Sequence, residues 1–364
     1  MRTIKTYSIV FLIVFAWVSS PAFAQGITAP RTPSPAAKVS QTIGISTVTV
    51  SYSRPSVKQR EVWGKLVPYG WNVDATFGAK NEAPWRAGAN ENTIIEFSHP
   101  ATVQGKPVPA GSYGLFFVIN KDNTGEVVLS KDYRSWGSFW YDPAHDQLRA
   151  SIQLREVPHT ELLTYDFINL DKNSAELVLT WEKKQFPVSI KFAVDDLVMA
   201  NAKEQLKGNI GFYWQSYAGA ANYALQNKVN LEQGLLWIDQ AIAQNKSFAT
   251  LNTKAGLLQE TGKTADADKI RQEAIAIATE IELNNYGYQL LGQAQYDKAI
   301  EIFKLNTERF PKSANAWDSL GEGYATKGDQ KNAVVSFKKS LGMNPPENVK
   351  ANSEKYLKQL GAMK

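Results

Sequence analysis

The hydrophobic pattern divides the chain into two halves that have different periods. Up to about residue 194, apolar and polar residues alternate in short runs, as where Val48, Val50 and Tyr52 are separated by Thr49 and Ser51. Alternation with a period of two indicates strands with one buried face. Beyond this point the apolar residues recur every three or four positions, which indicates amphipathic helices. The sequence therefore predicts a β half followed by an α half.

Several further runs in the first half have the composition of strands and are separated by turn residues such as Pro109-Ala110-Gly111. The runs are Thr93–Ser98, Tyr113–Asn120, Glu126–Ser130, Leu148–Arg155, Leu162–Asn169, Ala175–Trp181 and Val188–Val194. Many short strands without intervening helices are typical of an antiparallel β-sandwich, jelly-roll-like in form, or of an open barrel. Between Glu61 and Asn92 neither period is present, yet the segment is rich in tryptophan, which favours a functional loop over disorder.

The second half contains an internal repeat, which is clearest between Ala314 and Pro345. Trp317, Leu320 and Tyr324 share one helix face there, and a break follows at Lys327-Gly328-Asp329. A shift of 34 residues toward the N-terminus superimposes Gly321 on Gly287, Ala333 on Ala299, Phe337 on Phe303 and Pro345 on Pro311. This spacing resembles the tetratricopeptide repeat, a helix–turn–helix unit that must stack on neighbours to bury its apolar face. The resemblance implies an all-α solenoid with a concave groove for a protein or peptide.

These patterns predict a complete domain layout. We expect a signal peptide at 1–24, a flexible leader at 25–40, the β-sandwich at 41–195, a linker helix at 196–210, helical repeats at 211–346 and a C-terminal capping helix at 347–364. The signal peptide is indicated by Arg2 and Lys5 before the apolar run Tyr7–Val18, with the cleavage sequence Ala22-Phe23-Ala24 before Gln25. The run is shorter than the about 20 residues that span a bilayer, so we expect no stable membrane anchor.

Composition narrows the possible chemistry. Removal of Arg2 and Lys5 from the 40 basic residues leaves 38 against 35 acidic residues, a net charge of +3 that does not favour nucleic acid. The chain has no cysteine, which excludes thiol catalysis and cysteine-bound zinc. Its three histidines share no helical or strand spacing, and neither a phosphate-binding loop nor a nucleophile elbow is present. The sequence thus predicts no metal and no cofactor, and gives an enzymatic function no positive support.

Two clusters combine aromatic with polar residues in the β half. The first contains Trp85, Arg86, Asn90 and Glu91, and the second runs from Trp136 to Pro143. Aromatic faces beside such polar groups suit a polar organic ligand. We therefore expect a pocket with Trp85, Arg86, Asn90 and Glu91 on one wall, completed by Arg54, Arg60, Trp136, Tyr141 and Asp142. The alternative is that the tryptophans plug the ends of the sandwich and the charged groups pair with each other.

The β half also resembles a known family. Short motifs occur in the order Ser34-Pro35, Tyr52-Ser53-Arg54-Pro55, Leu66-Val67-Pro68-Tyr69-Gly70, Trp85-Arg86, Glu91-Asn92-Thr93 and Pro109-Ala110-Gly111-Ser112-Tyr113. Together they are similar to a family of secreted bacterial domains of unknown function, sometimes followed by tetratricopeptide repeats. The resemblance covers about residues 34–194 and implies a β-rich domain in the periplasm of, or secreted by, a Gram-negative bacterium. It implies no catalytic residue.

Three functions follow as hypotheses. The first is a non-catalytic periplasmic or secreted binding or scaffold protein, whose repeats hold a protein or peptide while the β domain binds a small polar ligand or glycan. The second is an enzyme that acts on such a ligand, for example a glycan, in the aromatic pocket. The third is a purely structural component of the cell envelope. A titratable pair beside Trp85 would favour the enzyme, because acid–base chemistry needs such groups within reach of the substrate.

Overall fold

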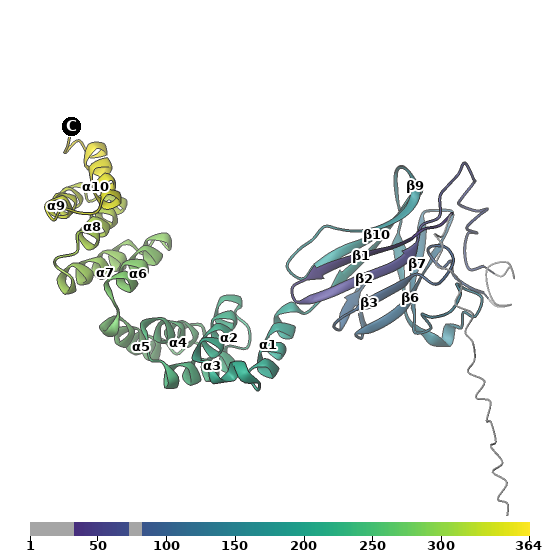
Figure 1. Ribbon diagram of the computed structural model, residues 1–364, viewed down its shortest axis with the longest axis horizontal. Coiled ribbons are helices and arrows are strands. Elements are labelled where there is room, and N and C mark those ends of the chain that lie inside the picture. The colour runs from purple at the N-terminus through teal and green to yellow at the C-terminus, as the bar shows by residue number, and fades with distance from the viewer. Residues whose placement is uncertain (1–32, 73–81) are drawn as a thin grey trace, which may run out of the picture. The chain divides into compact units, whose positions relative to one another are not determined.

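The computed structural model describes residues 33–72 and 82–364 (Figure 1). The chain forms two compact units, one ending at Phe192 and the other beginning at Ala193. The predicted signal peptide (1–24), its cleavage site before Gln25 and the first half of the predicted leader (25–32) lie outside the described residues.

The first unit consists of two antiparallel sheets. The larger has the strand order β1-β2-β3-β6-β7-β8, and the smaller has the order β5-β4-β10-β9. The strands are β1 (Ala36–Ile43), β2 (Ser46–Ser53), β3 (Ile94–Phe97), β4 (Ala101–Val103), β5 (Lys106–Val108), β6 (Gly111–Ile119), β7 (Thr124–Ser130), β8 (Asp146–Gln153), β9 (Arg155–Ile168) and β10 (Ser174–Lys191), with a short 3-10 helix η1 at Pro143–His145.

Aromatic rings join the two sheets. Phe117 of β6 and Phe186 of β10 are fully buried, and their ring centroids lie 5.0 Å apart. The rings come from different sheets, so this contact marks the interior between the two layers. In the described part of the unit, the two sheets do not close into a barrel. The antiparallel β-sandwich predicted from the sequence is thus confirmed, with two separate sheets.

Two strands differ from the sequence prediction for identifiable reasons. β1 begins at Ala36, within the segment predicted to be a flexible leader. Among the described strands it pairs with β2 alone, and most of its side chains are partly or fully exposed, so its sequence lacks the apolar alternation of a buried strand. The predicted runs Ala175–Trp181 and Val188–Val194 belong mainly to one strand, β10. Its pairing with β9 is irregular between Thr180 and Lys184, and this irregularity interrupts the period that the sequence shows.

The second unit is entirely helical in its regular structure. Its helices are α1 (Val194–Gln205), α2 (Trp214–Asn227), α3 (Leu231–Gln244), α4 (Phe248–Glu260), α5 (Thr264–Ile277), α6 (Glu280–Gly292), α7 (Tyr296–Arg309), α8 (Ala314–Lys327), α9 (Gln330–Leu341) and α10 (Glu347–Gln359), with a 3-10 helix η2 at Asn209–Phe212. Helices α2 to α9 form four successive hairpins, and α10 packs on α9 and α8. No helix in the described ranges is long and apolar enough to cross a membrane.

A glycine–phenylalanine contact joins the two helices within each of the last two hairpins. A Cβ atom at Gly321 of α8 would lie only 2.7 Å from the ring of Phe337 of α9, so glycine is needed for this close approach. Gly287 of α6 and Phe303 of α7 make the same contact one repeat earlier. Both phenylalanines are fully buried. The predicted repeat register is therefore confirmed, and it reflects how closely the two helices of a hairpin pack.

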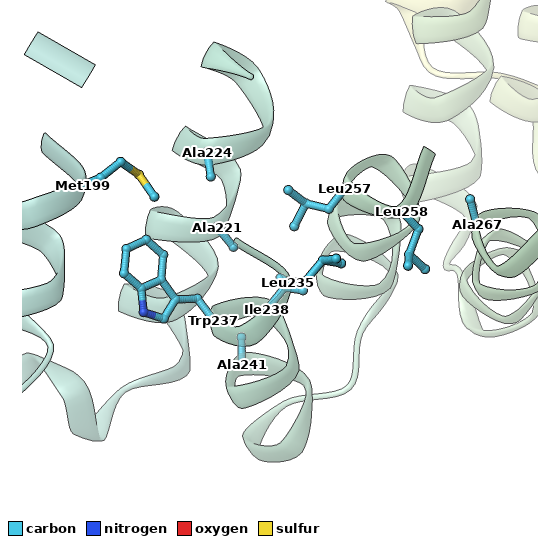
Figure 2. Close-up of a cluster of buried hydrophobic side chains, with 10 residues drawn as sticks. All are labelled: Met199, Ala221, Ala224, Leu235, Trp237, Ile238, Ala241, Leu257, Leu258 and Ala267. Atoms are coloured by element: carbon cyan, nitrogen blue, oxygen red, sulfur yellow. The ribbon is translucent and has the colours of Figure 1, made fainter. Parts of the chain in front are cut away.

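The first hairpins share a separate hydrophobic core. Figure 2 shows this cluster, in which Ala221 and Ala224 of α2 lie near Ile238 of α3 and Leu257 of α4. Alanines in α2 let neighbouring helices approach closely and leave room for the longer aliphatic side chains. The cluster also includes Met199 of α1, so α1 is packed against the repeats.

The stack of hairpins opens between the second and the third. Helices α3 and α4 pack side by side, as do α7 and α8, whereas α5 and α6 touch over far less of their length. Arg309 of α7 still connects the two parts, because its guanidinium donates hydrogen bonds to the carbonyl oxygens of Ile275 (2.7 Å) and Ala278 (2.9 Å). A cleft lies at this opening.

A buried carboxyl group, Asp318, and a half-buried one, Glu322, lie close together in the C-terminal repeats. Asp318 and Glu322 of α8 both accept hydrogen bonds from the side-chain amide of Asn352 of α10, at 2.8 Å for Asp318, and Ser353 donates to Asp318. Burial raises the pKa of both carboxyl groups above the ordinary values of 3.8 and 4.5, and the charge of Asp318 raises the pKa of Glu322 further. Tyr288 and Tyr356 face the same cluster and titrate only at much higher pH.

Because the pKa values of these carboxyl groups are raised, we expect the C-terminal repeats to lose stability as the pH rises. A raised pKa means that the folded state holds the proton more tightly than the unfolded state, so the stabilisation is present at acidic pH and is lost as the pH rises through the raised values. Glu322→Gln should make this loss smaller. Hydrogen exchange of α8–α10 measured from acidic to neutral pH tests this, and a variant with the same pH dependence as the wild type would contradict it.

Candidate functional site

The β unit contains an open cleft of about 660 Å³, here called the β cleft. Its floor is formed by Trp85 and Trp181, whose rings stack at a centroid distance of 5.8 Å and an interplanar angle of 17°. Trp85 is 8% exposed and pairs with Phe117 of β6 through two backbone hydrogen bonds of 2.9 Å, whereas Trp181 of β10 is 1% exposed. The two sheets therefore each contribute one side of the floor.

One wall of the β cleft carries Arg86 in a fixed position. The guanidinium donates a hydrogen bond to the backbone carbonyl of Asn90 and lies 5.7 Å from the centroid of the Phe139 ring. Gly137 has a φ of 65°, and a Cβ atom there would overlap the guanidinium, so glycine leaves the space that Arg86 occupies. Burial lowers the pKa of Arg86 below its ordinary value, but arginine remains charged in proteins.

The two aromatic clusters predicted from the sequence meet on this wall. Ser138 donates a buried hydrogen bond to the carbonyl of Pro84, which ties the second cluster to the first. The backbone at Ala87 is left-handed, with a φ of 52°, and its carbonyl oxygen accepts hydrogen bonds from Thr93 (3.1 Å) and Tyr165 (3.0 Å). A left-handed alanine is unfavourable by itself, so the surrounding bonds hold this loop in a conformation that it would not adopt alone.

A further part of the lining comes from the loop that follows β2. It includes Lys58, Arg60, Leu66 and Val67. Arg60 donates hydrogen bonds to the carbonyl oxygens of Val57 (3.0 Å) and Ser56, which hold its guanidinium over its own loop. Trp136, which is 46% exposed, lies at the rim with its indole open to solvent.

The structure brings together five of the nine residues that the sequence placed in the pocket. The five that line the β cleft are Trp85, Arg86, Asn90, Arg60 and Trp136. The other four, which are not among its lining residues, are Arg54, Glu91, Tyr141 and Asp142.

Arg54 has a structural role, because it binds to strand β9. Its guanidinium donates hydrogen bonds to the carbonyl oxygen of Leu163 (2.9 Å) and the hydroxyl of Thr164 (2.6 Å), both on β9. These contacts tie the end of β2 to the smaller sheet. The sequence could not separate this structural role from a binding role, because Arg54 stands close in sequence to Lys58 and Arg60.

Tyr141 and Asp142 lie elsewhere on the larger sheet. Tyr141 packs with Phe116 and Val128, and its hydroxyl donates to Asp146 at 2.7 Å. Asp142 accepts a hydrogen bond from the backbone N–H of Ala144 at 2.9 Å and so caps η1. On a strand, neighbours point to opposite faces, so the face that holds Phe116 is not the one that holds Phe117.

Sequence reasoning missed two important members of the β cleft. Trp181 stands in the middle of a predicted strand, where a buried tryptophan is ordinary, and only the pairing of distant segments places it under Trp85. Lys58 follows the Tyr52-Ser53-Arg54-Pro55 motif, and its exposed side chain gave no separate signal. Its backbone φ of 48°, and that of 58° at Gln59, mark an unusual loop that the sequence did not reveal.

The helical unit contains a second cleft, of about 810 Å³, at the opening between α5 and α6. We call it the helical cleft. Its lining residues come mostly from α4 to α7 and include six amide side chains: Asn252, Gln259, Gln272, Gln289, Gln293 and Gln295. Charges of both signs accompany them, among them Asp268, Arg271 and Lys298. Within residues 33–72 and 82–364, no group of three or more potential metal ligands is found.

The fold and the two clefts define a class of protein: a β-sandwich domain with a cationic cleft, joined to a solenoid of helical hairpins. Residues 34–190 match the family described as "Protein of unknown function (DUF2911)", so the first unit is a domain of this family. This confirms the resemblance seen in the sequence motifs. No curated protein matches the chain.

Solved structures are similar to the helical part of the chain. "YrrB: a TPR protein with an unusual peptide-binding site" has 18% identity and a TM-score of 0.28, and the match covers 44% of this chain and 84% of that one. PilF of Pseudomonas aeruginosa has 23% identity, a TM-score of 0.27 and coverage of 40% and 68%. A crystal structure of MamA has 20% identity, a TM-score of 0.29 and coverage of 43% and 91%. TM-scores this low do not support an assignment by themselves. The assignment of helical repeats therefore rests on the hairpins observed in this chain.

Proposed function

We propose that this protein is a non-catalytic binding or scaffold protein whose helical repeats hold an extended segment of a partner protein or peptide. The observation that carries the proposal is the helical cleft, with its six amide side chains between α4 and α7. An amide side chain offers both a donor and an acceptor, as a peptide backbone does. Repeat solenoids commonly present such extended surfaces to their partners.

The character of the helical cleft favours a peptide over a purely apolar partner. Apolar contacts are available at Tyr286, Leu290 and Ile302, while Arg271 and Glu301 offer charges of opposite sign. A peptide can satisfy the amides through its backbone and the apolar positions through its side chains. The mixed charges would then select among sequences, since wrongly placed charges weaken binding.

We expect the variant Asn252→Ala with Gln289→Ala to weaken peptide binding by about tenfold or more, since each lost hydrogen bond contributes about 0.5–1.5 kcal/mol. Peptides selected from a displayed random library on the full chain supply the ligands, and calorimetry measures their affinity. The matched control is Asn285→Ala with Gln240→Ala, which removes the same chemical groups outside the helical cleft. Selected peptides that bind both variants like the wild type would show that the cleft is not the binding site.

The β domain in this proposal binds a small polar ligand in the β cleft. The cleft volume of about 660 Å³ lies within the usual range for small-molecule sites. The alternative, an enzyme acting on a polar ligand such as a glycan, needs a general acid or base at the ligand. Among the described residues that line the β cleft there is no carboxylate and no histidine, so the geometry supports binding better than acid–base catalysis.

We further propose that the protein acts in the periplasm or is secreted. The support is the signal peptide expected from the sequence, together with the absence of cysteine, which fits a periplasmic fold held by ordinary hydrophobic cores. An intact mass of the protein from its own host that begins at Gln25 is the expected result. A mass that retains Met1 would oppose this localisation.

A further inference from the structure

The charges that line the β cleft are all of one sign. Lys58, Arg60 and Arg86 are among its lining residues, and no aspartate or glutamate of the described chain is. The whole protein carries nearly equal numbers of basic and acidic residues, so this local excess does not reflect the composition. A concave site lined by one sign of charge concentrates ligands of the opposite charge.

Arg86 has no carboxylate partner in the part of the chain that the structure describes. Its guanidinium donates a hydrogen bond to the carbonyl of Asn90, lies over the Phe139 ring and sits close to Gly137, which has no side chain. A half-buried guanidinium that lacks an anionic partner has given up part of its hydration without an ion pair in return. An incoming anion would supply that partner without first breaking an internal ion pair.

The other two cations that line the β cleft, Lys58 and Arg60, have exposed side chains. The hydrogen bonds of Arg60 to Val57 and Ser56 fix its guanidinium on its own loop. The ammonium group of Lys58 makes no hydrogen bond or ion pair with the described residues, although its backbone N–H donates to Glu161 at 2.9 Å. Both cations are exposed, so their main effect is to attract an anion toward the more buried Arg86.

The remainder of the lining suits an apolar ligand body. Leu66, Val67, Phe139 and Trp136 surround the space above the tryptophan floor. The indole Nε1 of Trp181 is buried and has no hydrogen-bond partner in the described residues. A buried donor without a partner is uncommon in folded proteins, and here it belongs to a residue of the cleft floor.

We propose that the β cleft binds a small organic anion, whose carboxylate or phosphate pairs with Arg86 and whose apolar body lies against Trp136 and Phe139. This inference rests on the proposed ligand-binding function of the β domain and specifies the ligand's chemical class. The planar fork of an arginine matches the two oxygens of a carboxylate or phosphate, so the same site accepts either group. Lys58 and Arg60 then determine how strongly anionic ligands are drawn in.

The test compares anionic probes with neutral analogues that have the same aromatic body. 3-Phenylpropanoate is compared with 3-phenylpropanamide, and phenyl phosphate with phenol, by ligand-observed NMR titration of the full chain. Inorganic phosphate serves as the anion without an apolar body. We expect at least one acid to bind about tenfold or more tightly than its neutral analogue, because charge-assisted hydrogen bonds are roughly twice as strong as neutral ones. Added salt should weaken only the acids.

Two substitutions connect this selectivity to Arg86. Arg86→Gln should lower the affinity for the acid to that for the neutral analogue and leave the neutral analogue's affinity unchanged. Arg134→Gln is the matched control, because Arg134 also lies over an aromatic ring, Tyr133, but does not line the β cleft. Lys58→Gln, at an exposed position, should weaken binding of the acid by about two- to fivefold.

The outcomes separate the two proposals. Equal binding of acid and neutral analogue by the wild type would overturn the anion inference and leave ligand binding by the β cleft standing. Absence of binding by every probe at millimolar concentration would count against both. Selectivity that survives Arg86→Gln and Lys58→Gln would place the anion at another site and reject the inference. Selective binding of inorganic phosphate equal to that of phenyl phosphate would reject the role given to Trp136 and Phe139.

Discussion

Phe337→Ala should lower the free energy of unfolding of the C-terminal repeats by about 3–5 kcal/mol, the usual cost of removing a buried aromatic side chain. Phe337 is fully buried, lies against Gly321 and stacks on Tyr356 of α10 at a centroid distance of 5.0 Å. One side chain therefore joins α8, α9 and α10. Because Gly321 has no side chain that could move into the gap, we expect a cavity that does not close.

The effect should be confined to part of the chain. In repeat proteins each repeat contacts mainly its neighbours, so a lesion spreads to adjacent repeats and weakens with distance. Hydrogen exchange should therefore accelerate in α8–α10 and to a smaller extent in α6–α7, while the β unit exchanges as in the wild type. The matched control is Val335→Ala on the same helix, since Val335 is 59% exposed. Unchanged exchange across residues 280–360 would refute the packing of this repeat.

The repeats could be predicted because their packing is local. The distance from Gly321 to Phe337 along the chain is that of one hairpin, and the same pair recurs at Gly287 and Phe303. Such contacts leave a periodic trace in the sequence. The opening between α5 and α6 left no such trace, because both helices keep an amphipathic pattern whether or not they pack closely on each other.

The candidate site in the β unit could be predicted only in part, for a related reason. Trp85, Arg86 and Asn90 are close in sequence, so one loop brings them to one wall. Trp181 reaches the same cleft through the pairing of β10 in the other sheet, and no local pattern encodes that pairing. Tyr141 was misplaced because Phe139 faces the β cleft while the chain then turns toward Phe116.

Substitutions of Trp181 and Trp136 should have different effects on the stability of the β unit and on its ligand binding. Trp181→Ala should destabilise the unit by about 3–5 kcal/mol, because the indole is almost fully buried. It stacks on Trp85 and meets Trp63 edge-on at 5.9 Å, so its loss removes the centre of an aromatic cluster. Trp136→Ala removes a side chain of the same size from the rim and should change stability by only about 0.5 kcal/mol.

Trp136→Ala should affect ligand affinity and not stability. Trp136→Ala should weaken phenyl phosphate while the β unit stays folded, because the lost surface is contact area for the ligand and not for the core. Stability is measured by hydrogen exchange in residues 36–191, and affinity by the same NMR titration. Suppose that Trp136→Ala destabilised the unit as strongly as Trp181→Ala and left affinity unchanged. The rim tryptophan would then be a plug at the end of the sandwich, and the β cleft would be part of the core's packing instead of a site for a ligand.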